Sequence, residues 1–431
     1  MARSSVSRRT FLKQAMGAAV AGPYIVQASA LGKGGRPGAN ERVTMACVGL
    51  GWQGPGNMNQ FLQQDDVQVV AVCDVDTAHL EKAKNRVNQH YGNTSCATYG
   101  DYRELFARDD IDAVMLALPD HWHAPIAVAA AKAGLDIFGE KPFSHRLAEG
   151  RAMVETLKRY GRVWQTGSWQ RSQSHFRRAA ELVRNGRIGK LVRVEVGLPG
   201  GVYARKDETF QDPPAELNYN MWLGPAPWAP YCPARVHVNW RWHLDYGGGQ
   251  LMDWIGHHLD IAHWGMGNDD KIGPLSVEAK GDFLTEGLWN VPTRYYAKCE
   301  YPNEVEVILA GGHGEIRGGT KWIGTDGWVW VNRGGWDASS ASLKEEVIGP
   351  NEIHLFKSPG HWRNFVDCVK SRAKTLTPAE VAHRSASPGH LAYISMYTGR
   401  KIRWDAAKEE IIGDTEASRL LNKAYRAPWA I

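Results

Sequence analysis

A short glycine motif between a predicted strand and a predicted helix constrains the fold of this chain more than any other feature. The apolar run 43–48 suits a strand that is buried on both faces. It leads directly into Gly49-Leu50-Gly51-Trp52-Gln53-Gly54, a G-x-G-x-x-G pattern, and a helix is predicted over about 55–64. Because such glycines allow a tight turn and close approach of the backbone to a pyrophosphate, the motif predicts a dinucleotide-binding Rossmann domain.

The end of the second predicted strand indicates which dinucleotide is bound. The apolar run 67–73 is followed by Asp74, at the position where this fold places a carboxylate against the adenosine ribose. A carboxylate there accepts hydrogen bonds from the ribose hydroxyls and repels a 2′-phosphate, so we expect NAD rather than NADP. Asp76 is close enough in sequence to share this role or to take it over.

Strand and helix patterns continue to alternate, which predicts a parallel sheet with helices on both of its faces. Ligands in such sheets bind beyond the carboxyl ends of the strands. Two of these ends carry reactive side chains, in Pro119-Asp120-His121-Trp122-His123 and in Gly139-Glu140-Lys141-Pro142. The further predicted elements are helices at 78–89, 102–107 and 124–133 and strands at 113–118 and 135–138.

These motifs resemble the glucose-fructose oxidoreductase, inositol dehydrogenase and MocA (Gfo/Idh/MocA) family. The resemblance rests on the glycine loop, on Ala117-Leu118-Pro119-Asp120 with His123, and especially on Glu140-Lys141-Pro142, and it extends over nearly the whole chain after the N-terminal segment. It implies an NAD-dependent oxidoreductase. The positions we expect to bind the cofactor are Gly49, Gly51, Trp52, Gln53, Gly54, Asp74, Pro119, Asp120, His123, Glu140 and Lys141.

The pattern changes after about residue 165, where separated strand-like runs replace the alternation. Runs at 191–196, 295–301 and 305–309 predict a largely antiparallel sheet. By resemblance, the open face of this sheet forms the substrate floor and the subunit contact, so we expect a homo-oligomer. The predicted fold class is therefore a Rossmann α/β domain followed by an α+β domain. The predicted segments are 1–30 (signal), 31–40 (linker), 41–165 (NAD-binding) and 166–431 (substrate and oligomerisation).

An acid and a histidine in the second domain are candidates for proton transfer. Asp253 and His257 are four residues apart, so on a helix they share one face. A carboxylate beside an imidazole raises its basicity and fixes its tautomer, as a general base near pH 7 requires. The family pattern also has an Asp-x-x-x-His pair here, which implies that His257 is the base and that Asp253 orients both His257 and Lys141.

Lys141 is the third expected catalytic residue, although most lysines are simply solvated. It follows a buried strand and precedes a proline that can orient it through a cis bond. A cation beside the nicotinamide would hydrogen-bond the reacting hydroxyl and stabilise alkoxide character as the hydride leaves.

A metal site is an alternative explanation for the histidines. The spacing of His121 and His123 could hold a metal ion, and so could the helical spacing of the Asp253–His257 pair with His258, Asp260 and His263. The resemblance already assigns Asp253 and His257 to hydride chemistry, and a typical family member needs no metal. We therefore predict no metal.

Tryptophans are the remaining compositional signal. The chain has 18, and six of them lie between residues 222 and 264. Most are expected to pack in the core, but rings near His257 suit the apolar faces of a sugar. The expected substrate-binding residues are Trp240, Arg241, Trp242 and His258.

The N-terminal 30 residues resemble a twin-arginine export signal. Arg8 and Arg9 precede Phe-Leu-Lys and an alanine-rich apolar stretch that ends in the small-residue sequence 28–30. We expect export by the twin-arginine (Tat) machinery and a periplasmic or extracytoplasmic location. An uncleaved single-span anchor and an amphipathic helix are the alternatives.

Charge and cysteine content exclude several classes of protein. The net charge of +5 comes from the N-terminal 40 residues, so no basic surface for nucleic acid is predicted. Beyond residue 30 there is no apolar run of about 20 residues, so no transmembrane segment is expected in the mature chain. The six cysteines lack C-x-x-C spacing, which argues against a zinc ribbon or a disulfide scaffold, and Cys47 and Cys73 are expected to be buried.

Together these features predict an exported, NAD-dependent oxidoreductase acting on a secondary hydroxyl of a sugar or glycoside. Because little free NAD is available outside the cytoplasm, we expect a tightly bound cofactor that is reduced and reoxidised in place. One alternative is a redox-neutral NAD-dependent glycosidase that acts through a transient 3-keto sugar. A second alternative is a noncatalytic sugar-binding protein.

Overall fold

The computed structural model describes residues 37–202 and 209–431, and the chain forms two compact units, 1–42 and 43–431. The expected signal and most of the predicted linker lie outside the described residues. In the first unit the structure describes one short 3-10 helix, η1 (Ala39–Glu41). No helix in the described part of the chain is long and apolar enough to span a membrane.

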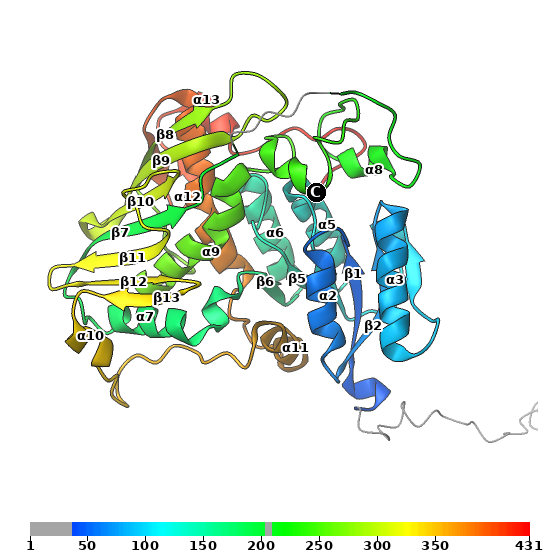
Figure 1. Cartoon of the computed structure of the whole chain (residues 1–431), viewed down its shortest axis with the longest axis horizontal. Helices are drawn as coiled ribbons and strands as arrows, with labels where there is room; N and C mark the ends of the chain where they lie inside the picture. The colour runs from blue at the N-terminus through cyan, green and yellow to red at the C-terminus, as the bar shows by residue number, and fades with distance from the viewer. Residues whose placement is uncertain (1–36, 203–208) are drawn as a thin grey trace, which may run out of the picture. The chain divides into compact units, whose positions relative to one another are not determined.

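A six-stranded parallel sheet opens the second unit, with the strand order β3-β2-β1-β4-β5-β6 (Figure 1). This confirms the predicted Rossmann domain. The strands are β1 (Val43–Val48), β2 (Val67–Cys73), β3 (Ala97–Tyr99), β4 (Ala113–Leu116), β5 (Asp136–Gly139) and β6 (Trp164–Thr166). The helices are α2 (Gly54–Leu62), α3 (Thr77–Tyr91), α4 (Tyr102–Leu105), α5 (Asp120–Lys132) and α6 (Leu147–Arg159).

Both faces of this sheet are covered because its strands are apolar on both sides. In β1, Met45 and Cys47 pack in a cluster with residues of α2 and α3. Ala46 and Val48, on the opposite face, pack in a second cluster with residues of α5 and α6. Continuous burial of this kind leaves only the strand ends free to carry function.

The second sheet has nine strands in the order β13-β12-β11-β7-β10-β9-β8-β14-β15 (Figure 1). Its pairs are antiparallel, as predicted, except for β7 and β10, which are parallel. The strands are β7 (Leu191–Leu198), β8 (Ser276–Phe283), β9 (Pro292–Glu300), β10 (Glu306–Gly311), β11 (Gly319–Gly324), β12 (Trp328–Asn332), β13 (Gly335–Ala338), β14 (Ile402–Asp405) and β15 (Glu410–Ile411).

Three long helices lie against this sheet: α7 (Ser174–Arg184), α9 (Gly249–Met266) and α12 (Ala379–Thr398). Helix α9 carries the Asp253–His257 pair, so the predicted helical face is confirmed. The remaining elements are η2 (Trp169–Ser172), α8 (Tyr219–Leu223), η3 (His237–Trp242), η4 (Pro302–Glu304), α10 (Ala341–Glu345), α11 (His361–Ser371) and α13 (Thr415–Arg419).

Helix α11 belongs to the C-terminal half of the sequence but packs on the Rossmann domain. Its Phe365 ring lies 5.9 Å from the ring of Phe61 in α2 and 5.8 Å from that of Phe138 in β5. The predicted boundary between residues 165 and 166 falls inside β6, the last strand of the first sheet. The two halves of the second unit are therefore joined by packing as well as by the chain.

All six cysteines are buried and free of disulfide bonds. Burial raises the pKa of the Cys96 thiol to about 11, and it raises the pKa of Cys47 and Cys73 further still. The expectation that Cys47 and Cys73 act as small buried hydrophobes is confirmed.

Candidate functional site

Two glycines of the loop after β1 are required by the packing of the protein itself. Gly49 has a φ of +82°, and a Cβ at this position would lie 2.2 Å from the carbonyl oxygen of Ala117. A Cβ on Gly54 would lie 1.9 Å from the carbonyl oxygen of Gly49. These contacts bring the start of α2 close to β1 and β4.

Gly51 differs from Gly49 and Gly54, because a Cβ at this position would clash with no atom of the protein. Its φ is outside the left-handed range, and the nearest atom to a Cβ would be in the His79 ring, 3.7 Å away. The missing side chain thus leaves space on the outer side of the loop, where a pyrophosphate needs to approach the backbone of a helix N-terminus. The loop fits a dinucleotide.

The two acids after β2 have separate structural roles. Asp74 accepts hydrogen bonds from the backbone N–H of Leu50 at 2.5 Å and of Asp76 at 2.9 Å, and burial raises its pKa. Asp76 caps α3 by accepting from the backbone N–H groups of Ala78 and His79. Asp74 is therefore linked directly to the glycine loop, which favours it over Asp76 as the ribose ligand.

A cleft of about 660 Å³ opens beside Asp74. Its lining includes Arg103 from α4, and Arg426 and Trp429 from the C-terminal residues 426–429. These residues carried no sequence signal, because they come together only through the return of the chain's end to the first domain. The cleft could accommodate the adenosine half of a dinucleotide.

At the end of β5, Lys141 is held by the second domain. Its Nζ donates to Oδ1 of Asp253 at 2.7 Å, and Nε of Arg241 lies 3.4 Å from the same oxygen. Burial alone would raise the pKa of Asp253, but Lys141 and Arg241 outweigh it and lower this pKa. The carboxylate therefore stays ionised and fixes both cations.

The loop that carries Lys141 is positioned by His123. The Lys141–Pro142 peptide bond is cis. His123 Nδ1 lies 2.6 Å from the carbonyl oxygen of Pro142, and its Nε2 lies 3.0 Å from that of Leu118. His123 thus connects the ends of β4 and β5, a structural role beside the cofactor contact expected from the sequence.

His257 lies in the same region, but its environment differs from the expectation. Burial, with Lys141 and Arg333 nearby, lowers the pKa of His257 well below 6.5. We expected Asp253 to raise the basicity of His257. This expectation is wrong, because the Asp253 carboxylate is bonded to Lys141 and Arg241. His257 Nδ1 is buried without a partner among the described residues. The imidazole is neutral at pH 7 and can accept a proton.

Two further acids lie at the strand ends. Burial raises the pKa of Asp120 to about 8, so this side chain is mostly protonated at neutral pH. The other acid, Glu140, accepts from Asn57 Nδ2 at 2.9 Å, and burial raises its pKa as well. Asn57 was missed by the sequence analysis because nothing in its neighbourhood distinguishes it from an ordinary helical residue.

The expected substrate-binding residues divide into two groups. The Arg241 guanidinium lies 4.5 Å from the ring centre of Trp240 and 4.8 Å from that of Trp52, which is largely exposed on the glycine loop. Trp242, by contrast, packs beside Trp289, and the ring of His258 stacks on Trp254. Only the first group lies directly beside the Lys141–Asp253 pair.

The histidines of the metal alternative are bonded to other protein groups. His121 Nε2 lies 3.1 Å from the Trp222 carbonyl oxygen, and His263 Nε2 lies 2.8 Å from the Tyr301 hydroxyl. Asp260 is paired with Arg171 at 2.7 Å. Among the described residues, the group that could gather round a metal ion is a different one, Asp76, His79 and His237.

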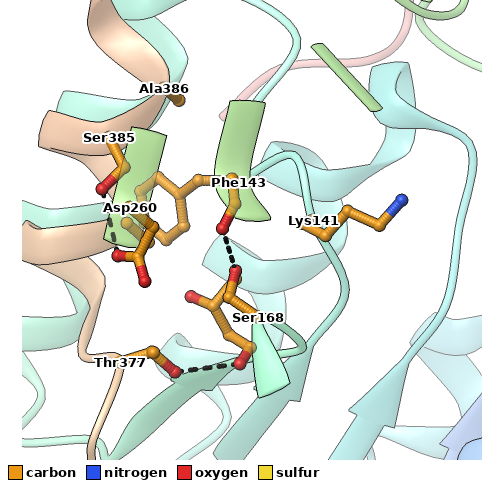
Figure 2. A pocket seen from close by; sticks show the side chains of 10 residues that line it. Lys141, Phe143, Ser168, Asp260, Thr377, Ser385 and Ala386 are labelled. Atoms are coloured by element: carbon orange, nitrogen blue, oxygen red, sulfur yellow. Dashed lines mark hydrogen bonds between the residues drawn. The ribbon is translucent and has the colours of Figure 1, made fainter. Parts of the chain in front are cut away.

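A small cavity of about 10 Å³ lies behind Lys141, large enough for about one water molecule. Figure 2 shows the stem of Lys141 at its edge while the ammonium group extends away from it, and it shows Asp260 turned toward Ser385. This cavity is a packing feature beneath the site, and Lys141 presents its charge on the other side.

A glycine loop after β1, a buried carboxylate after β2 and a lysine after β5 are arranged on an NAD-binding Rossmann fold. The chain belongs to the Gfo/Idh/MocA family. Residues 43–168 match the family's NAD-binding Rossmann fold, and residues 175–431 match its C-terminal alpha/beta domain.

Curated relatives are similar over part of the chain. The chain is 33% identical over 172 residues to "Glycosyl hydrolase family 109 protein 2" of Shewanella sp. (strain ANA-3). This alignment covers 36% of the chain and 38% of the relative.

Solved structures share the fold over most of the chain. The WlbA dehydrogenase of Bordetella pertussis, in complex with NADH and UDP-GlcNAcA, has a TM-score of 0.63 at 18% identity and covers 84% of this chain and 99% of its own. The aldose-aldose oxidoreductase of Caulobacter crescentus has a TM-score of 0.61 at 18% identity, with the same coverage.

Proposed function

We propose that the protein oxidises or reduces a secondary hydroxyl of a sugar or glycoside with an NAD molecule that stays bound. The observation that carries this proposal is the pairing of Lys141 with Asp253 beside a buried, uncharged His257. A fixed ammonium group and a neutral imidazole are the hydrogen-bond donor and the proton acceptor that carbinol oxidation requires.

Bound NAD supplies the hydride acceptor. Lys141 donates a hydrogen bond to the reacting oxygen and stabilises the negative charge that develops on it. His257 takes the hydroxyl proton, because its low pKa leaves the imidazole unprotonated throughout the neutral range. Asp253 holds Lys141 in place, so its role is to position the lysine rather than to activate the histidine.

A redox-neutral glycosidase is the second candidate, favoured by the names of the curated relatives. Oxidation of a ring hydroxyl would acidify the neighbouring C–H bond and permit elimination of the leaving group. Water would then add to the resulting unsaturated ketone, and return of the same hydride to the ketone would restore the hydroxyl and the oxidised cofactor. Both candidates use the same residues, and they differ in whether a glycosidic bond is broken.

The test begins with the protein as purified. Denaturation should release NAD, which mass spectrometry detects, and oxidation of one sugar should proceed without added cofactor when a second sugar with a carbonyl group is present to take the hydride back. Replacing Lys141 or His257 with Ala should lower kcat by roughly 10²-fold or more while NAD stays bound, whereas His354→Ala, an exposed histidine, serves as the control. Full turnover by His257→Ala would refute the mechanism. Cleavage of a glycoside without net reduction would select the second candidate.

For cellular location, we propose export through the twin-arginine pathway. The paired Arg8 and Arg9 and the small residues at 28–30 support it. Replacement of both arginines with Lys should leave the precursor in the cytoplasm, as fractionation and immunoblotting would show. Mature protein outside the cytoplasm in this variant would refute the proposal.

We also propose that the protein is a homo-oligomer assembled through its C-terminal sheet. The proposal rests on resemblance to the family, and light scattering coupled to size exclusion tests it. A monomer at micromolar concentration would contradict it.

A further inference from the structure

Arg333 is a cation at the mouth of the site that the proposed mechanism does not use. It lies in the turn between β12 and β13, and its side chain is held between two indole rings. The guanidinium carbon is 4.7 Å from the ring centre of Trp169 and 4.5 Å from that of Trp254. Two such contacts fix the direction of the side chain without using its N–H groups.

Those N–H groups have no protein acceptor. Across residues 37–202 and 209–431, Arg333 has neither a hydrogen bond nor an ion pair, and it is exposed to solvent. Burial lowers its pKa, and among the described residues the acids Asp253 and Glu140 act in the opposite direction. Asp253 is already shared by Lys141 and Arg241. The site therefore holds more positive than negative side-chain charge, and Arg333 carries the uncompensated part.

The location of Arg333 relates this charge to the reaction. The Trp254 ring that supports it is 5.6 Å from the His257 ring. The Trp254 indole thus contacts both Arg333 and the expected base, His257, and Arg333 lies on the side of the C-terminal sheet. A sugar whose hydroxyl lies at His257 would extend a ring substituent toward the guanidinium.

We propose that Arg333 binds a carboxylate on the substrate, so that the substrate class is acidic sugars or their glycosides. A planar guanidinium with free, preoriented N–H groups matches a carboxylate through two parallel hydrogen bonds, and no neutral hydroxyl uses it as well. This inference rests on the proposed function, because it places a sugar hydroxyl at His257.

Binding of matched sugar pairs to the NAD-loaded protein tests the proposal. The probes are the methyl glycosides of glucuronic, galacturonic and mannuronic acid, each compared with the neutral glucoside, galactoside or mannoside. Calorimetry and quenching of tryptophan fluorescence measure the dissociation constants. At least one acid should bind about tenfold or more tightly than its neutral partner, the scale of one charge-assisted hydrogen-bonded pair.

The variants identify Arg333 as the cause of that preference. Arg333→Gln should bring the preferred acid to within about twofold of its neutral partner, and Arg333→Lys should restore only part of the preference. Arg317→Gln is the matched control, because Arg317 also lies over a tryptophan, Trp330, but already has Asp337 as an ionic partner. This control should keep the wild-type preference.

Two results would overturn the inference: no acid preferred in any of the three pairs, or an Arg333→Gln variant that loses acid and neutral sugars equally. Binding does not require turnover, so the two proposals fail separately. An Arg333-dependent preference in a protein without redox activity would refute the proposed function and leave Arg333 as the group that binds the carboxylate of an acidic sugar.

Discussion

At the scale of single residues, the glycines of the loop after β1 differ in what requires them: packing within the protein requires one, and the space for the ligand requires another. Gly49 cannot be replaced without a backbone clash, whereas Gly51 has free space around it. We expect Gly51→Val to lower NAD affinity by tenfold or more with an unchanged melting temperature, because the added side chain occupies space that the pyrophosphate needs. Titration of the cofactor-free protein measures this. Gly49→Ala is the contrasting variant, and it should lower the melting temperature.

Asp74 gives a second residue-scale prediction. Asp74→Ala should weaken NAD binding and reduce discrimination against NADP, since both a ribose acceptor and a source of repulsion for a 2′-phosphate are removed. The variant also deprives the Leu50 N–H of its acceptor, so some loss of loop order is expected. Dissociation constants for both cofactors are the measurement. The assignment is wrong if their ratio does not change, and Asp76→Ala would then be the variant to examine.

At the scale of elements, helix α9 is constrained at two glycines for different reasons. A Cβ on Gly265 would lie 2.6 Å from the Trp322 ring, while one on Gly256 would lie 3.2 Å from Cβ of Lys141. We expect Gly265→Ala to cost about 1–3 kcal/mol of unfolding free energy, as overpacking of a core does. Gly256→Ala should instead lower kcat by displacing Lys141, with little loss of stability. Urea unfolding and steady-state kinetics separate the two effects, and equal loss of stability in both variants would contradict this view.

Helices and strands that the local sequence pattern determines could be predicted from the sequence. Contacts between elements that are far apart in the sequence could not. The run 67–73 is β2 without any shift, and the Asp253–His257 spacing correctly indicated a helix. The parallel pairing of β7 with β10 has no local signature, since either strand could pair in either direction. The contact between Asp253 and Lys141 likewise has no local signature: sequence spacing relates Asp253 only to His257, whereas folding brings Lys141 to the carboxylate from another domain.

For the molecule as a whole, buried histidines determine how stability responds to acid. Burial lowers the pKa of His121 and His390 to about 3 and that of His123 and His361 to about 4. Below pH 6.5 the unfolded chain binds protons that the folded protein cannot, so stability is complete above pH 6.5 and is lost as the pH falls toward 4. Each such group contributes up to about 1.4 kcal/mol per pH unit in this window.

The measurement is the urea midpoint at pH 7, 6 and 5 with NAD kept saturating. The midpoint should fall at each step. Burial raises the pKa of Asp74, Asp120, Glu140 and Asp260, and these acids act in the opposite direction, but they are fewer than the buried histidines whose pKa is lowered. A midpoint that is constant or rises from pH 7 to pH 5 would show that these histidines are accessible to protons in the folded state.

Helix α11 packs on the first domain although it lies late in the sequence, and this affects how that domain folds during translation. Phe61 and Phe138 complete their aromatic cluster only with Phe365, which leaves the ribosome more than 200 residues after β5. An emerging Rossmann domain therefore exposes an apolar surface for most of the time that translation takes. During that interval, the surface around Phe61 and Phe138 is a defined region for chaperones that bind apolar surface. A separately expressed N-terminal half would leave the same surface permanently exposed.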